Sequence, residues 1–187
     1  MHLQTERLVL RLPRLDDAEA LVDAVSDPET MRYIGDGSTT DLAGARRTIG
    51  KWLARWAESG LGQLAVEGRE DGAFLGRAGF LVWDREEWRI GSRPELGERA
   101  EVEIGWTLLR RHWGHGYATE AALALRDWAL GEAGLTRLIS LIQHGNERSV
   151  RVAEKLGERY ERDVEVMGMR TRLFALGQAP ARVTRAA

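Results

Sequence analysis

The sequence contains no cysteine among its 187 residues. Disulfides, thiolate metal sites and covalent intermediates on a cysteine sulfur are therefore excluded. Histidine is scarce as well, with four in the chain. No HExxH pattern occurs, and His112 and His115 lack nearby carboxylates in ligand register. The sequence predicts no metal site, so any chemistry must use other groups.

An excess of one charge and a long apolar run are also lacking. The formal net charge is −2 and the pI is about 6.1, whereas a general nucleic-acid binder carries a basic excess that neutralises phosphates. Charges at Glu6, Arg7 and Arg11 interrupt the start of the chain, and no apolar run approaches the roughly 18 residues of a membrane helix. We expect a cytoplasmic, unprocessed protein with neither nucleic acid nor membrane as a partner.

The composition is that of an ordinary globular protein, with 43% hydrophobic and 30% charged residues. The length suits one core and shows no internal repeat. We therefore expect one domain over residues 1–176 and a flexible tail over residues 177–187.

Alternating and amphipathic segments predict a mixed α/β fold with helices flanking a mostly antiparallel sheet. Strands are expected at residues 8–12, 62–67, 73–82, 101–109, 137–142, 159–166 and 170–176. Helices are expected after Asp16-Asp17, after Asp27-Pro28, after Thr40-Asp41, and at residues 117–131 and 146–156, while the polar segment 84–99 is expected to be a loop. The helix between the strands 101–109 and 137–142 predicts one parallel crossover.

The stretch "RRHWGHGYATEA", from Arg110 to Ala121, places two glycines directly before a helix. The first amides of a helix have no carbonyl partners and favour an anion. A dinucleotide-binding loop would require a further glycine or alanine where Thr119 stands, and a Walker loop would require a lysine that is absent here. Both nucleotide interpretations therefore match the sequence poorly.

The pattern Arg111-x-x-Gly114-x-Gly116 between a strand and a helix resembles the GNAT superfamily of N-acetyltransferases. Other pieces of the resemblance follow in order along almost the whole chain: "TERLVLRLPRLDDAEAL", "AEVEIGWTL", "GHGYATEA" and "NERSVRVAEKLG". Together they resemble the RimJ/RimL-like branch, some members of which acetylate protein N-termini. The resemblance implies a GNAT-like α/β fold with a strand–loop–helix unit that binds coenzyme A (CoA), and acetyl-CoA as co-substrate.

The glycine loop and its flanks supply the expected acetyl-CoA contacts. Gly114 and Gly116 let main-chain amides approach an anion without a Cβ in the way, and Arg111 and His112 are expected to add positive charge nearby. Asn146 is expected to cap a helix, and the resemblance implies that it also contacts the pantetheine arm. The predicted acetyl-CoA residues are Trp106, Thr107, Leu108, Arg111, His112, Gly114, His115, Gly116, Tyr117, Ala118, Thr119 and Asn146.

Two residues are candidates for the chemistry. Strand alternation places Glu103 on the same face as Gly105, where it either accepts the proton of the attacking amine or simply faces solvent. Ser149 matches the Asn-x-x-Ser of RimL-like members, and this resemblance implies that it protonates the leaving thiolate. Ala153 stands where many members have a tyrosine acid, so that role falls to Ser149 or to water. Glu158 replaces an aromatic residue that usually follows the helix-ending glycine, which leaves the local packing open.

The sequence gives less information about the acceptor substrate than about acetyl-CoA. Tyr33 and Trp83 are the predicted acceptor contacts, and Trp52, Trp56 and Trp88 are further candidates, although aromatic residues at helical spacing usually belong to the core. We expect a primary amine, preferably the α-amine of a peptide or protein. A small-molecule amine and a CoA-binding module without turnover remain alternatives, and a homodimer is compatible with the sequence.

Overall fold

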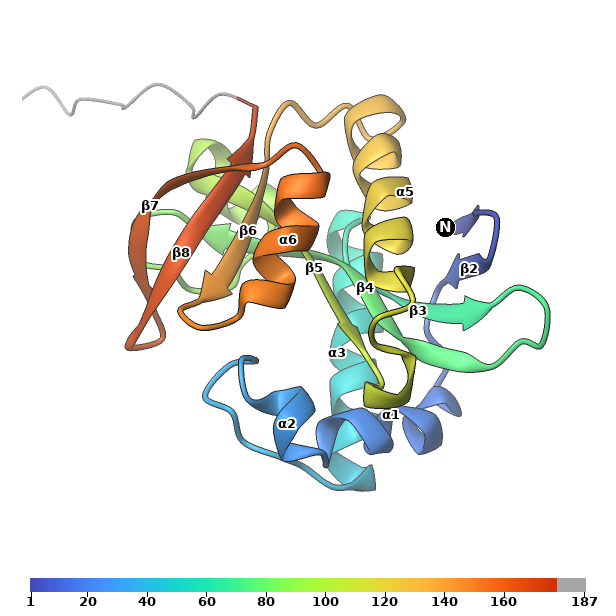
Figure 1. The fold of residues 1–187 in the computed structure, drawn as a ribbon. Coiled ribbons are helices and arrows are strands. Elements are labelled where there is room, and N and C mark those ends of the chain that lie inside the picture. Colours follow the sequence, from blue (N-terminus) through green and yellow to red (C-terminus); the bar gives the residue numbers. More distant parts are fainter. Residues whose placement is uncertain (178–187) are drawn as a thin grey trace, which may run out of the picture.

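The computed structural model describes residues 1–177, so the predicted tail lies almost entirely outside the described residues. Figure 1 shows a strongly twisted sheet with helices on its faces and edge. In the described part of the chain, the sheet has eight strands in the spatial order β1-β2-β3-β4-β5-β6-β8-β7. Their bounds are β1 His2–Gln4, β2 Leu8–Arg11, β3 Gln63–Gly68, β4 Phe74–Asp84, β5 Ala100–Leu108, β6 Leu138–Gln143, β7 Arg159–Val166 and β8 Met169–Leu176. The predicted mixed, mostly antiparallel α/β fold is confirmed.

The predicted parallel crossover lies between β5 and β6. Every other neighbouring pair is antiparallel, and the parallel pair is in register only at Glu103 and Ile139. The Ser140 hydroxyl donates to the Ile104 carbonyl at 3.0 Å. Beyond this point the strands separate, which opens the second half of β5 toward the helices.

Within residues 1–177, six α-helices surround the sheet, and their ends follow local capping chemistry. Their bounds are α1 Asp17–Val25, α2 Pro28–Met31, α3 Leu42–Ser59, α4 Arg93–Leu96, α5 Tyr117–Gly131 and α6 Glu147–Lys155. The Asp41 side chain accepts from the amide of Gly44 at the start of α3, and Gly60 ends that helix with a φ of +65°. No helix within residues 1–177 is both long and apolar enough to span a membrane.

The main core lies between the sheet and α5. Phe80, Ile104, Leu125 and Leu138 are among its fully buried members. In Figure 1, α5 and α6 lie over the near face of the sheet, and α1 and α2 lie below its lower edge. The packing of α5 against β4 and β5 therefore fixes the position of the loop that precedes this helix.

Two parts of the chain differ from the sequence-based expectation. The strand β1 was not predicted, because its three residues form a strand by pairing with β2 at the sheet edge. The segment 84–99 contains α4 and a short 3₁₀ helix, η1 Gly97–Arg99. The helix α4 begins with a capping box in which Ser92 and Glu95 exchange hydrogen bonds, a sequence signal that the loop interpretation overlooked.

Candidate active site

Two hollows meet at the point where β5 and β6 separate. The first, the inner cavity, has a volume of about 180 Å³ and reaches Arg77, Trp83 and Glu103 on β4 and β5. The second, the groove, has a volume of about 390 Å³ and runs between the start of α5 and α6. The two hollows share the lining residues Tyr33, Ile34, Trp106, Thr107, Asn146 and Ser149. The two hollows therefore adjoin each other at these residues, and together they are called the passage.

The start of α5 forms one wall of the groove. Its N-cap is Gly116, which has a φ of +82° and offers no side chain to the first helical amides. Gly114 also has a φ of +82°. Both dihedral angles lie in the left-handed region that favours glycine. The open space around Gly114 and the uncapped amides of α5 suit an anionic ligand.

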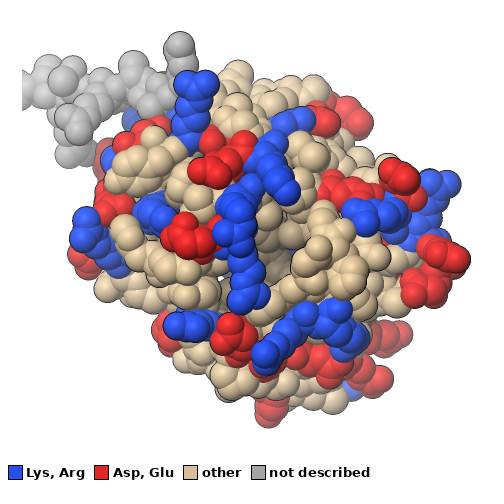
Figure 2. All heavy atoms as spheres, in the orientation of Figure 1, with Lys and Arg blue, Asp and Glu red and all other residues tan. Residues whose placement is uncertain are grey.

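The opposite wall of the groove is basic. Arg148, Arg151 and Lys155 of α6 all line it, and Figure 2 shows a column of blue side chains running down this face beside a hollow. Arg148 lies 3.6 Å from Glu29 and stacks over the Trp113 ring at 4.4 Å. These three residues were not among the predicted acetyl-CoA contacts, although their spacing of three and four places them on one helical face.

Three predicted charge or loop contacts behave differently in the structure. Arg111 points away from the groove and pairs with Asp23 at 3.0 Å, so it is not positioned to bind a ligand there. His112 does line the groove, but burial lowers its pKa and thereby favours the neutral imidazole. His115 stacks on Tyr117 at 5.8 Å and does not line the groove. Local sequence places all three near the loop, but side-chain direction depends on what packs beside them.

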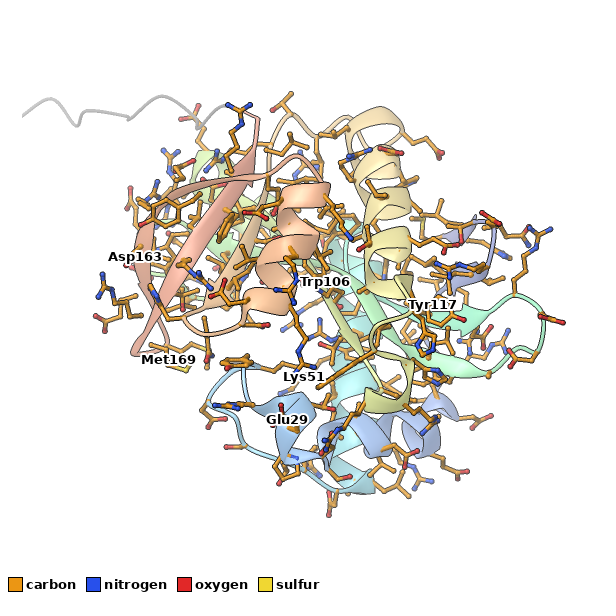
Figure 3. All side chains as sticks on the ribbon, in the orientation of Figure 1. Glu29, Lys51, Trp106, Tyr117, Asp163 and Met169 are labelled. Atoms are coloured by element: carbon orange, nitrogen blue, oxygen red, sulfur yellow. The ribbon has the colours of Figure 1, made fainter. Side chains whose placement is uncertain are left out.

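The other predicted acetyl-CoA residues do line the groove. They are Trp106, Thr107, Leu108, Gly114, Gly116, Tyr117, Ala118, Thr119 and Asn146. In Figure 3, Tyr117 lies at the start of α5 and Trp106 lies between α5 and α6. The Thr107 hydroxyl is buried and has no hydrogen-bond partner among residues 1–177. An unpaired buried hydroxyl at the junction of the two hollows is suited to a ligand that passes through them.

Glu103 lies in the wall of the inner cavity and not on an open face. Its Oε2 accepts a hydrogen bond of 2.6 Å from the Trp83 indole, and the nearby Leu141 backbone amide also acts to lower the pKa of this carboxyl group. Burial raises the pKa of Glu103, while Trp83 and the nearby Arg77 oppose the rise. A raised pKa makes the ionised carboxylate a stronger base. Glu103 is partly buried in the cavity wall, so its surroundings differ from those of a fully exposed glutamate.

Asn146 and Ser149 lie where the two hollows join. The Asn146 side-chain oxygen accepts from the Ser149 amide at 3.3 Å, as expected for a helix cap. Both side chains line the cavity and the groove. The cap therefore fixes the Asn146 side chain at the wall and leaves its amide nitrogen available to a ligand.

Of the aromatic acceptor candidates, only Tyr33 and Trp83 line the inner cavity. Trp52 belongs to the core between α1 and α3, and Trp88 packs beside Trp83 without lining the cavity. Trp56 packs against Trp128 and donates to the Gln63 carbonyl at 2.9 Å. The expectation that most of these rings are core is confirmed.

Glu158 is buried without a counter-charge of its own. It is 3% exposed, and both carboxyl oxygens lack a hydrogen-bond partner of good geometry among residues 1–177. The pKa of Glu158 is raised to about 8, mainly by burial; Ser140 opposes the rise, and the charge of Glu103 contributes to it. The neighbouring Arg137 is already paired with Glu101 at 2.9 Å and with Glu161 at 2.8 Å. The carboxyl group is therefore protonated at neutral pH.

Comparisons with known proteins agree with this geometry. The family model described as "Acetyltransferase (GNAT) domain" matches residues 7–159. The chain is 31% identical over 154 residues to a Bacillus licheniformis protein named uncharacterized N-acetyltransferase p20, covering 82% of this chain and 80% of that one. A crystal structure of an acetyltransferase from Agrobacterium tumefaciens superimposes with a TM-score of 0.76 at 31% identity, covering 95% of both chains.

A more distant structure shares the fold alone. It is RimL, a ribosomal L7/L12 α-N-protein acetyltransferase in complex with CoA, and it superimposes with a TM-score of 0.76 at 14% identity. The alignment covers 95% of this chain and 98% of RimL. The family model and the two relatives at 31% identity all identify the chain as an acetyltransferase, which agrees with the geometry of the passage. The chain therefore belongs to the GNAT family of acetyltransferases and is an N-acetyltransferase.

Proposed function

We propose that the protein transfers an acetyl group from acetyl-CoA to a primary α-amine, and that the preferred acceptor is the N-terminus of a peptide or protein. The observation that carries this proposal is the passage formed by the two adjoining hollows: an uncapped helix start lies in the groove, and the partly buried carboxylate of Glu103 lines the inner cavity. The RimJ/RimL-like branch, the cytoplasmic location and the homodimer stay predictions.

The groove fits the chemistry of acetyl-CoA. The uncapped amides of α5 would hold the pyrophosphate, and Arg151 and Lys155 would balance its charge from α6. Neither side chain has an acidic partner within 4.0 Å in the described part of the chain. The junction at Thr107 would lead the thioester toward the cavity, since its buried hydroxyl lacks a partner.

The proposed reaction is a direct attack by the amine. The amine nitrogen forms a bond to the thioester carbonyl carbon, the carbon–sulfur bond breaks, and the amine proton passes to Glu103 directly or through water. The thiolate takes a proton from Ser149 or water. Because the pKa of an α-amine is about 7.7–8.0, against about 10.4 for lysine, it is the easier nucleophile for one carboxylate base at neutral pH.

A panel of acceptors tests the proposal. The purified protein and acetyl-CoA are assayed for CoA release with N-terminal peptides, lysine peptides with blocked N-termini, polyamines and aminoglycosides, and mass spectrometry locates the acetyl group. We expect acetylation of the free peptide N-termini. Turnover confined to blocked lysine peptides or to aminoglycosides would overturn the choice of acceptor, and binding of acetyl-CoA without any turnover would indicate the CoA-binding module.

The role of Ser149 is tested separately. We expect Ser149→Ala to lower the turnover number without weakening acetyl-CoA binding, because the hydroxyl lies at the junction of the two hollows and not at the start of α5. Rates that equal those of the parent at every pH would assign the proton to water.

A further inference from the structure

A cation lies in the inner cavity without an acidic partner. Arg77 stands on β4 opposite Thr107 of β5 and lines the cavity. Its Nη1 donates to the Gln63 side-chain oxygen at 2.8 Å, and no carboxylate of residues 1–177 lies within 4.0 Å of it. Burial lowers the pKa of Arg77, and the charge of Glu103 opposes the change. A partly desolvated guanidinium with only a neutral partner is suited to an anion from outside.

Gln63 holds the guanidinium of Arg77 in place. Gln63 is 2% exposed, and its side-chain amide donates to the Phe80 carbonyl at 3.2 Å. This bond turns the other end of the Gln63 amide, its oxygen, toward Arg77. Because Gln63 itself is neutral, it orients the cation without cancelling the charge. An ordered guanidinium loses less entropy when it binds a carboxylate.

Gly105 lies between this cation and the proposed base. A Cβ atom built on Gly105 would come 3.8 Å from Arg77 Nη1 and 3.8 Å from Glu103 Oε1. No ion pair within 4.0 Å joins Arg77 and Glu103. Because each of these two atoms lies 3.8 Å from the same point, Arg77 Nη1 and Glu103 Oε1 are separated by at most twice that distance. A larger residue would fill the space between them. The cavity is therefore lined by the carboxylate of Glu103 and the guanidinium of Arg77, with space for a small chemical group between them.

We propose that the acceptor carries a carboxylate close to its amine, and that Arg77 is the specificity-determining residue that binds this carboxylate while Glu103 faces the amine. The inference rests on the proposed function, since it names the class of amine that the same cavity takes. Two sources supply this chemistry. A peptide that begins with aspartate or glutamate would supply the carboxylate through its side chain, in agreement with the preferred acceptor proposed above, whereas a free α-amino acid would supply its α-carboxylate and would replace the peptide as the preferred acceptor. A cavity of about 180 Å³ accommodates a single residue of either.

Matched pairs of acceptors test the carboxylate. Alanine is compared with alaninamide, and an Asp-Ala-Ala amide peptide with its Asn-Ala-Ala counterpart, by CoA release and, in the presence of CoA, by calorimetric binding. In at least one pair we expect the carboxylated member to have a kcat/KM about 10- to 100-fold higher, as a charge-assisted pair with arginine provides. The pair that shows the preference identifies the source.

Variants assign the preference to Arg77. Arg77→Met should bring the ratio within a pair close to one, and Arg77→Lys should retain part of the preference. Arg47→Met removes an exposed arginine of α3 and should leave the ratio unchanged. Thermal melts of each variant establish that it is folded.

The outcomes separate this inference from the proposed function. Equal kcat/KM and equal binding within both pairs for the parent would overturn the carboxylate subsite, even if turnover is high. A preference that survives in folded Arg77→Met would overturn the role of Arg77. Binding that depends on both the carboxylate and Arg77, without CoA release for any acceptor, would support the subsite and refute the proposed activity.

Discussion

The buried Glu158 makes the stability of this protein depend on pH in a direction opposite to that of an ordinary surface carboxylate. Its pKa rises from the usual 4.5 to about 8 in the folded protein. Between these values the folded state holds a proton that the unfolded state has released. The free energy of unfolding is therefore highest below pH 4.5 as far as this group is concerned, and it falls as the pH rises through about 8.

The size of the effect follows from the shift in pKa. One pH unit corresponds to about 1.4 kcal/mol, so the interval from 4.5 to about 8 corresponds to a loss of about 5 kcal/mol in the free energy of unfolding. This is a large part of the ~5–15 kcal/mol that stabilises a typical domain. Other titrating groups add their own slopes, so the contribution of Glu158 is measured as a difference between proteins.

The variant Glu158→Gln isolates this contribution, because glutamine has the same shape and does not ionise. Urea denaturation at pH 5, 7 and 9 should show similar stability at pH 5 and a variant more stable than the parent by several kcal/mol at pH 9. The exposed Glu154→Gln on α6 serves as a control and should follow the parent. If Glu158→Gln loses as much stability as the parent between pH 5 and pH 9, Glu158 is ionised in the fold and the reasoning is wrong.

Three further predictions concern the passage. Gly116→Val should abolish the thermal shift given by acetyl-CoA, which at 100 times the dissociation constant corresponds to about 2.7 kcal/mol, while Gly50→Ala keeps it; a full shift in the Gly116 variant would contradict the anion role of the helix start. Glu103→Gln should lower turnover roughly 10²- to 10⁴-fold without weakening acetyl-CoA binding and should remove the rise of rate with pH; unchanged rates at every pH would exclude a base. Arg151→Gln combined with Lys155→Gln should raise the KM for acetyl-CoA and reduce its dependence on salt, and an unchanged KM would place the phosphates elsewhere.

Local sequence determined those parts of the site that depend on neighbouring residues. The bounds of α5 agree with the predicted helix because Gly116 precedes it and its apolar spacing continues without a break. The Asn146 cap follows from its position before α6. Alternation along β5 placed Glu103 and Gly105 on one face, and the structure brings a Cβ at position 105 within 3.8 Å of Glu103 Oε1.

Tertiary structure decided which of these residues face the ligand passage. The register of β4 against β5 brings Arg77 opposite Thr107, and nothing within either strand specifies that register. Arg111 turns to Asp23 because α1 packs nearby, although the loop alone suggested an anion contact. The position of Glu158 after a helix-ending glycine does not by itself predict burial. In the folded chain the side chain is buried, and this burial raises its pKa to about 8. Hydrogen bonds within a helix are local, whereas strand pairing and burial join distant segments, so only the folded chain determines the electrostatics of the site.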